Sequence, residues 1–119
     1  MEKEFVPYEL ALKLKELGFD EPCLDCYHIY GKRWEMRLNK QSTIEGACLA
    51  PTFSQAFRFF REKYGWVAEI HGSLQVNHFY ANLLLQAKGE VRNIKMCDTY
   101  EEAELACLIK LIEIVKNLK

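Results

Sequence analysis

The sequence predicts an α+β fold with elements in the order α-β-β-α-β-β-β-α, in a single domain that covers residues 1–119. Amphipathic helical patterns lie near both ends and in the middle of the chain, and the segments between them alternate apolar and polar residues as strands do. Gly or Pro stands at the boundaries. With 119 residues, half of them apolar, the chain has room for one globular domain. We expect an antiparallel sheet of about five strands with helices mainly on one face.

The first helix is expected from about Pro7 to Leu17. Proline suits the first helical position, because its missing N–H has no partner there and its fixed φ is already helical. Leucines follow at helical spacing, and Gly18 suits a left-handed cap. These signals together predict both ends of this helix.

A β-hairpin is expected next. Residues 34–38 alternate apolar and charged side chains, and residues 23–30 are the expected partner strand across a tight turn at residues 31–32. Residues 39–50 have no clear period. We therefore expect a loop there.

The second helix is expected to begin after Pro51, because Thr52 and Gln55 have the spacing of a capping box. Gly65 is expected to end it. Projection on a helical wheel leaves Phe59 facing outward with the arginines. The expected inner face consists of Phe53, Ala56, Phe57 and Phe60.

Three further strands are expected at residues 66–71, 76–86 and 90–96, with turns at residues 72–73 and 88–89. The middle strand has no charged residue, which indicates a place inside the sheet and not at its edge. These strands should form an antiparallel meander.

The last helix is expected from Asp98-Thr99 to about Leu118, and Thr99 and Glu102 again have capping-box spacing. Its expected core stripe consists of Ala103, Cys107, Leu111, Ile114, Val115 and Leu118. Three further aliphatic residues, Leu105, Ile109 and Ile112, fall outside that stripe. A helix that is apolar on two sides is either sandwiched in its own domain or offers a surface to a partner. We expect a homodimer through these three residues, and the alternative is that the same chain covers them.

The five cysteines are expected to stay reduced, because five thiols cannot all pair and the first residues lack the apolar segment of an export signal. Cys23, Cys26 and His28 have partial zinc-ligand spacing, but no second close pair completes a site. Buried structural cysteines are the favoured interpretation, and no metal or cofactor is predicted. His71 and His78 have no neighbouring motif that indicates catalysis, so no enzyme activity is predicted.

Nucleic-acid binding is the alternative function. The basic residues that would serve it are Arg58, Arg61 and Lys63 in the second helix and Arg33 beside the hairpin turn. The formal net charge of −1 gives no general attraction to phosphate. We therefore expect no sequence-independent affinity for DNA at physiological salt. No segment is apolar enough to suggest a membrane span.

Three stretches, residues 5–22, 50–58 and 99–108, resemble a family of short proteins of unknown function that gut Bacteroidales, their phages and other mobile elements encode. The resemblance covers all three expected helices. It implies a bacterial or phage cytoplasm and no particular chemistry. The leading interpretation is a non-enzymatic interaction or accessory protein that self-associates and has a host or phage protein as a further partner.

Overall fold

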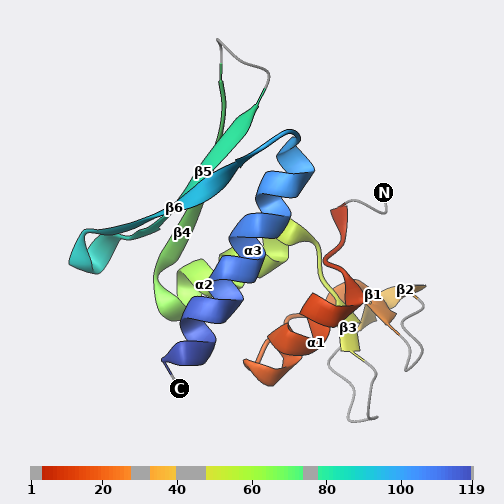
Figure 1. The fold of residues 1–119 in the computed structure, drawn as a ribbon. Helices are drawn as coiled ribbons and strands as arrows, with labels where there is room; N and C mark the ends of the chain where they lie inside the picture. The colour runs from red at the N-terminus through yellow and green to blue at the C-terminus, as the bar shows by residue number, and fades with distance from the viewer. Residues whose placement is uncertain (1–3, 28–32, 40–47, 74–77, 119) are drawn as a thin grey trace. The chain divides into compact units, whose positions relative to one another are not determined.

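The computed structural model describes residues 4–27, 33–39, 48–73 and 78–118 (Figure 1). The fold is α+β, and the expected order of elements is confirmed with two additions, the short strand β3 and the 3₁₀ turn η2. The elements are α1 (Tyr8–Glu16), β1 (Cys23–Tyr27), β2 (Arg33–Asn39), β3 (Cys48–Ala50), α2 (Phe53–Tyr64), β4 (Trp66–Gly72), β5 (Phe79–Leu85), η2 (Gln86–Lys88), β6 (Glu90–Cys97) and α3 (Tyr100–Asn117).

The chain divides into two compact units, Met1–Ala56 and Phe57–Lys119, and each unit has its own antiparallel sheet. The strand orders are β2-β1-β3 and β4-β5-β6. The expectation of one sheet of about five strands is therefore wrong for the described residues. Strands that are close in sequence pair most readily, and α2 separates the two groups of strands along the chain. The assignment of residues 1–119 to a single domain stays a prediction.

Helix α1 begins and ends within one residue of the predicted positions, with Pro7 as its N-cap and not its first helical residue. Pro7 precedes it with a φ of −58°. Gly18 has a φ of 96°, which favours glycine, and its N–H donates to the Lys15 carbonyl over 3.0 Å. The N–H of Phe19 donates to the Leu14 carbonyl, also over 3.0 Å, and both side chains are buried. These bonds form the glycine-dependent cap that the sequence predicts.

Strands β1 and β2 form the expected antiparallel pair, while the expected turn at residues 31–32 lies outside the described residues. The expectation of a loop over residues 39–50 is wrong at β3, which pairs with β1. All three β3 residues are buried, and β3 contacts α1. A strand buried on both faces shows no alternation of polar and apolar residues, so periodicity could not indicate it.

Helix α2 begins with the predicted capping box. The Gln55 N–H donates to Thr52 Oγ1 over 3.2 Å, and the Thr52 N–H donates to Gln55 Oε1 over 3.1 Å. Gly65 ends the helix with a φ of 78°. The expectation that Phe59 faces outward is wrong, because Phe59 is buried. Its ring packs against Tyr64 at 5.9 Å between centroids, and the Lys63 ammonium lies over it at 5.4 Å.

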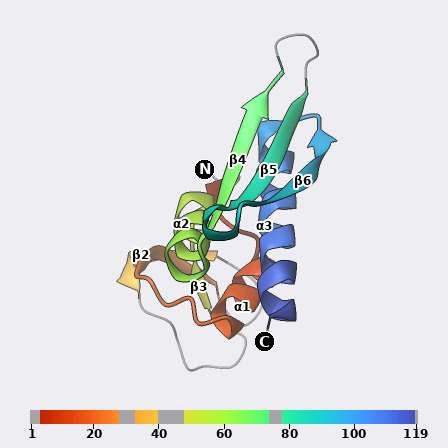
Figure 2. The ribbon, with the colours of Figure 1, turned by 90° about the vertical axis from the view of Figure 1, so that its left-hand side faces the viewer.

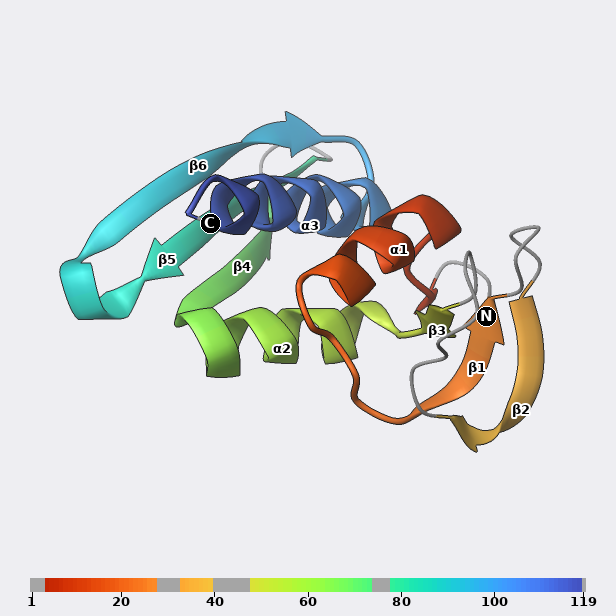
Figure 3. The same cartoon turned by 90° about the horizontal axis from the view of Figure 1, so that it is seen from below.

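In the second unit, β5 lies between β4 and β6, as its lack of charge predicts. Helix α3 packs against one face of this sheet and contacts all three strands (Figures 2 and 3). Ala81 and Leu83 of β5 are buried on that side. The sheet therefore has one face against a helix and a second face on the opposite side.

Helix α3 begins with Thr99, whose side chain accepts a hydrogen bond from the Glu102 N–H. The expected core stripe is buried, except that Leu118 is 71% exposed because the helix ends before it. Leu108 and Ile112 are buried as well. No helix among the described residues is long and apolar enough to cross a bilayer.

Candidate functional site

The face of sheet β4-β5-β6 that points away from α3 is the candidate site, and we call it the outer face. Neighbouring residues in a strand point to opposite sides, so the outward residues alternate with buried Ala81 and Leu83. Directly paired residues of adjacent strands share a side, which arranges the outward residues in rows across the sheet. No described element of the unit Phe57–Lys119 lies over this face in Figures 2 and 3.

Two rows cross all three strands of the outer face. The first is apolar and consists of Val67, Leu84 and Val91. The second is polar and consists of Glu69, Asn82 and Asn93. This pattern differs from a core face, which would be apolar in every row, and from an ordinary solvated face, which would be polar in every row.

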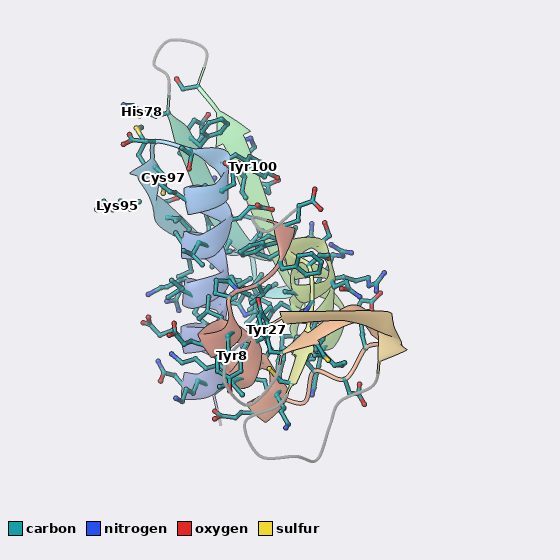
Figure 4. All side chains as sticks on the ribbon, turned by 90° about the vertical axis from the view of Figure 1, so that its right-hand side faces the viewer. Tyr8, Tyr27, His78, Lys95, Cys97 and Tyr100 are labelled. Atoms are coloured by element: carbon teal, nitrogen blue, oxygen red, sulfur yellow. The ribbon has the colours of Figure 1, made fainter. Side chains whose placement is uncertain are left out.

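A β-bulge in β6 completes a third row with His71 and Tyr80, whose rings lie 5.4 Å apart between centroids. The register shifts because β6 has two residues, Lys95 and Met96, where β5 has Tyr80. A bulge changes the direction of the side chains in the bulged strand, and both of these residues are exposed. Figure 4 shows Lys95 extending from β6 away from α3.

Exposed apolar surface concentrates on the outer face. Six large apolar side chains in the described residues are exposed, and three of them belong to this face: Tyr80 at 41%, Val91 at 55% and Met96 at 51%. Single exposed apolar residues are ordinary, but a group on one face is typical of a contact surface. The charged residues Glu69 and Lys95 border this group on β4 and β6.

The three residues that the sequence proposes for an α3 interface are not equally accessible. Ile112 is 4% exposed, Leu105 is half-buried and Ile109 is 46% exposed. The buried arc of α3 is therefore wider than the expected stripe and includes Ile112. Ile109 remains an exposed aliphatic side chain among polar neighbours. An interface formed by Leu105, Ile109 and Ile112 stays a prediction.

Three of the five cysteines are buried thiols, and Cys26 and Cys97 are half-buried. No disulfide joins any two of the five cysteines, all of which lie among the described residues, and Cys23, Cys48 and Cys107 are buried. Burial raises the pKa of Cys48 to about 11 and that of Cys107 to about 12, so both thiols are neutral near pH 7. Within the described residues, no three His, Cys, Asp or Glu side chains lie close enough to hold a metal ion, and His28 lies outside them.

Two described histidines lie beside carboxylates. On the outer face, His71 Nε2 lies 3.8 Å from Glu69 Oε1. At the junction of β5, β6 and α3, His78 lies beside Asp98 (Figure 4). The distance between His78 Nδ1 and Asp98 Oδ1 is 3.0 Å, although the approach lies outside hydrogen-bond geometry. The neighbouring thiol of Cys97 donates to the Lys95 carbonyl over 3.3 Å. In a catalytic triad the nucleophile would donate its hydrogen bond to the histidine, so the residues at this junction lack the order of such a triad.

The basic residues of the nucleic-acid alternative lie in different units. Arg61 and Lys63 are exposed near the end of α2, and Arg58 is exposed one turn earlier. Arg33 lies in β2, in register with Tyr27 of β1. Tyr27 itself is buried and donates a 2.6 Å hydrogen bond to the Val6 carbonyl, with the Tyr8 ring at 5.4 Å (Figure 4). Phe59, the ring that the sequence places outward with the arginines, is buried and so is not available for base stacking, while Phe57 and Tyr64 of the same helix are half-buried.

Sequence reasoning missed the outer face. The uncharged strand β5 indicates a central position, but its alternating residues Tyr80, Asn82 and Leu84 also indicate a half-exposed face. Tyr80 and Asn82, which alternate with buried Ala81 and Leu83, were the available sequence signal for this face. The bulge that turns Met96 outward has no such signal in the sequence.

Comparisons of this chain with protein-family models, with curated proteins and with solved structures find no significant match. A function therefore has to be argued from the residues themselves.

Proposed function

We propose that the protein is a non-enzymatic interaction protein of a bacterial or phage cytoplasm, and that it self-associates. The observation that carries this proposal is the exposed apolar group of Tyr80, Val91 and Met96 on the outer face. Full burial of a side chain of this size is favourable by roughly 1.5–3 kcal/mol, so a partner surface that covered the group would gain a useful part of that energy.

The same face suits a reversible contact better than a permanent one. Its apolar row lies beside the amides of Asn82 and Asn93, which stay solvated when the protein is free. Non-obligate interfaces are about as apolar as the rest of a protein surface. A host or phage protein and a second copy of this chain are both partners that such a face accommodates.

Site-specific photo-crosslinking tests the proposal in the complete chain. A photoreactive phenylalanine analogue in place of Tyr80 should give discrete protein adducts in bacterial cells. The same analogue at Glu113, which is exposed on α3, is the matched control and should give few. Equal adduct yields at the two positions, or none at Tyr80, would contradict an interaction role for the outer face.

A further inference from the structure

We infer that the outer face binds the outer face of a second copy, around a two-fold axis parallel to β5. This inference rests on the proposed function and names its partner and geometry. Two-fold symmetry is the commonest arrangement of soluble homo-oligomers, and it requires a surface that complements itself. The rows of the outer face satisfy that requirement.

A rotation about an axis parallel to β5 keeps each row at its own height and exchanges β4 with β6. In the apolar row, Leu84 then faces Leu84 of the second copy, and Val67 faces the second copy's Val91. Polar and aromatic rows likewise meet rows of their own kind, so Asn82 faces an amide and Tyr80 faces a tyrosine. No apolar side chain is placed against a charge.

Charge supports the same axis. Glu69 lies on β4 and Lys95 on β6, one row apart along the sheet, and these two edge strands are about 9.6 Å apart across two strand spacings. The rotation brings β4 of one copy over β6 of the other. Glu69 of each copy then lies one row from Lys95 of the other copy, so the symmetry gives two such pairs. Packed sheets are about 10 Å apart, which two long side chains can span.

The size of the face predicts a weak dimer. Three strands about 4.8 Å apart, with about 3.3 Å per residue over seven residues, give a footprint of roughly 330 Å² per copy. Stable interfaces bury about 800 Å² per partner, and weak transient encounters lie below that size. We therefore expect association that depends on concentration.

Charge reversal tests the geometry in the complete chain. Light scattering after size exclusion should give a mass that rises toward twice the monomer as the load rises from about 20 μM to about 500 μM. Glu69→Lys alone and Lys95→Glu alone should each weaken this rise, because every cross-copy pair becomes like-charged. An equimolar mixture of the two variants should restore the rise, because the mixed dimer has two opposite-charge pairs again.

Glu62→Lys and Lys116→Glu are the matched controls, since both residues are exposed and lie on helices. They should self-associate like the native chain. A native chain that stays monomeric at about 500 μM would overturn self-association. Association that both single reversals leave unchanged, and that Ile109→Asp abolishes, would overturn this inference and keep the self-association part of the proposed function, with α3 as its surface.

Discussion

Two isoleucines of α3, three residues apart, should respond very differently to truncation. Ile112 is 4% exposed and Ile109 is 46% exposed. Both lie inside the same helix, so replacement by alanine improves helix propensity by a similar amount, about 0.4 kcal/mol, at each position. The difference between the two variants therefore reports burial.

The expected magnitudes follow from those exposures. Ile112→Ala removes buried aliphatic atoms and leaves a cavity, which costs about 2–5 kcal/mol of unfolding free energy. Ile109→Ala loses contacts on about half of its side chain and leaves no closed cavity, so about 1 kcal/mol or less is expected after the gain in propensity. A difference of roughly 2–3 kcal/mol between the variants corresponds to a difference in Tm of roughly 10 °C for a chain of this size.

Urea unfolding followed by circular dichroism measures both variants. A concentration of about 5 μM keeps a weak dimer dissociated, so that the result reflects folding alone. Ile109→Asp adds a second test, because a carboxylate at an exposed position should leave the protein folded and soluble. Equal losses for the two alanine variants, or an unfolded Ile109→Asp, would refute the assignment of Ile109 to the surface and Ile112 to the core.

Two further predictions concern the buried thiols and the basic residues. Because burial raises the pKa of Cys48 from 9.0 to about 11, the folded chain keeps a proton that the unfolded chain loses. This contribution to stability is complete below pH 9 and falls by up to about 1.4 kcal/mol per pH unit between about pH 9 and 11. Urea curves of Cys48→Ala should show a shallower decline over that range, and an unchanged slope would contradict the assignment. The native chain and the double variant Arg58→Ala, Arg61→Ala should both pass a heparin column at about 0.15 M salt. Retention of the native chain that the double variant loses would favour nucleic-acid binding.

Helix ends were predictable because their determinants are local. Thr52 and Gln55 satisfy each other's backbone N–H groups, and at the start of α3 the Glu102 N–H donates to Thr99 Oγ1. Gly18 and Gly65 adopt the positive φ that ends a helix. Each of these interactions joins residues within four positions of each other, so the local sequence is enough to predict them.

Most errors arose where contacts with residues distant in the sequence determine whether a residue is buried or paired. Phe59 is a different case: it projects outward on a helical wheel, but the Lys63 ammonium and the Tyr64 ring, four and five residues further along the same helix, pack against it. Strand β3 exists because β1 offers it an edge and α1 contacts it, and neither element is near it in sequence. The buried arc of α3 likewise extends to Ile112, which a symmetrical wheel excludes. Tertiary packing overrides the local pattern at β3 and at Ile112.

The candidate surface exists because the second unit has one sheet and one helix packed against it. A three-stranded sheet has two faces, and α3 can cover one of them. An outer face that was fully apolar would need a second layer or would aggregate, while one that was fully polar would have no affinity for a partner. Asn82 and Glu69 keep the free face solvated, and Val91 and Met96 supply area that a partner can cover.

The bulge in β6 contributes to this surface because it adds a second outward side chain opposite Tyr80 at the sheet edge. Deleting Lys95 should restore regular alternation with Met96 as the one residue opposite Tyr80, so the outer face would keep its apolar group and lose the Lys95 charge while the sheet retained its pairing.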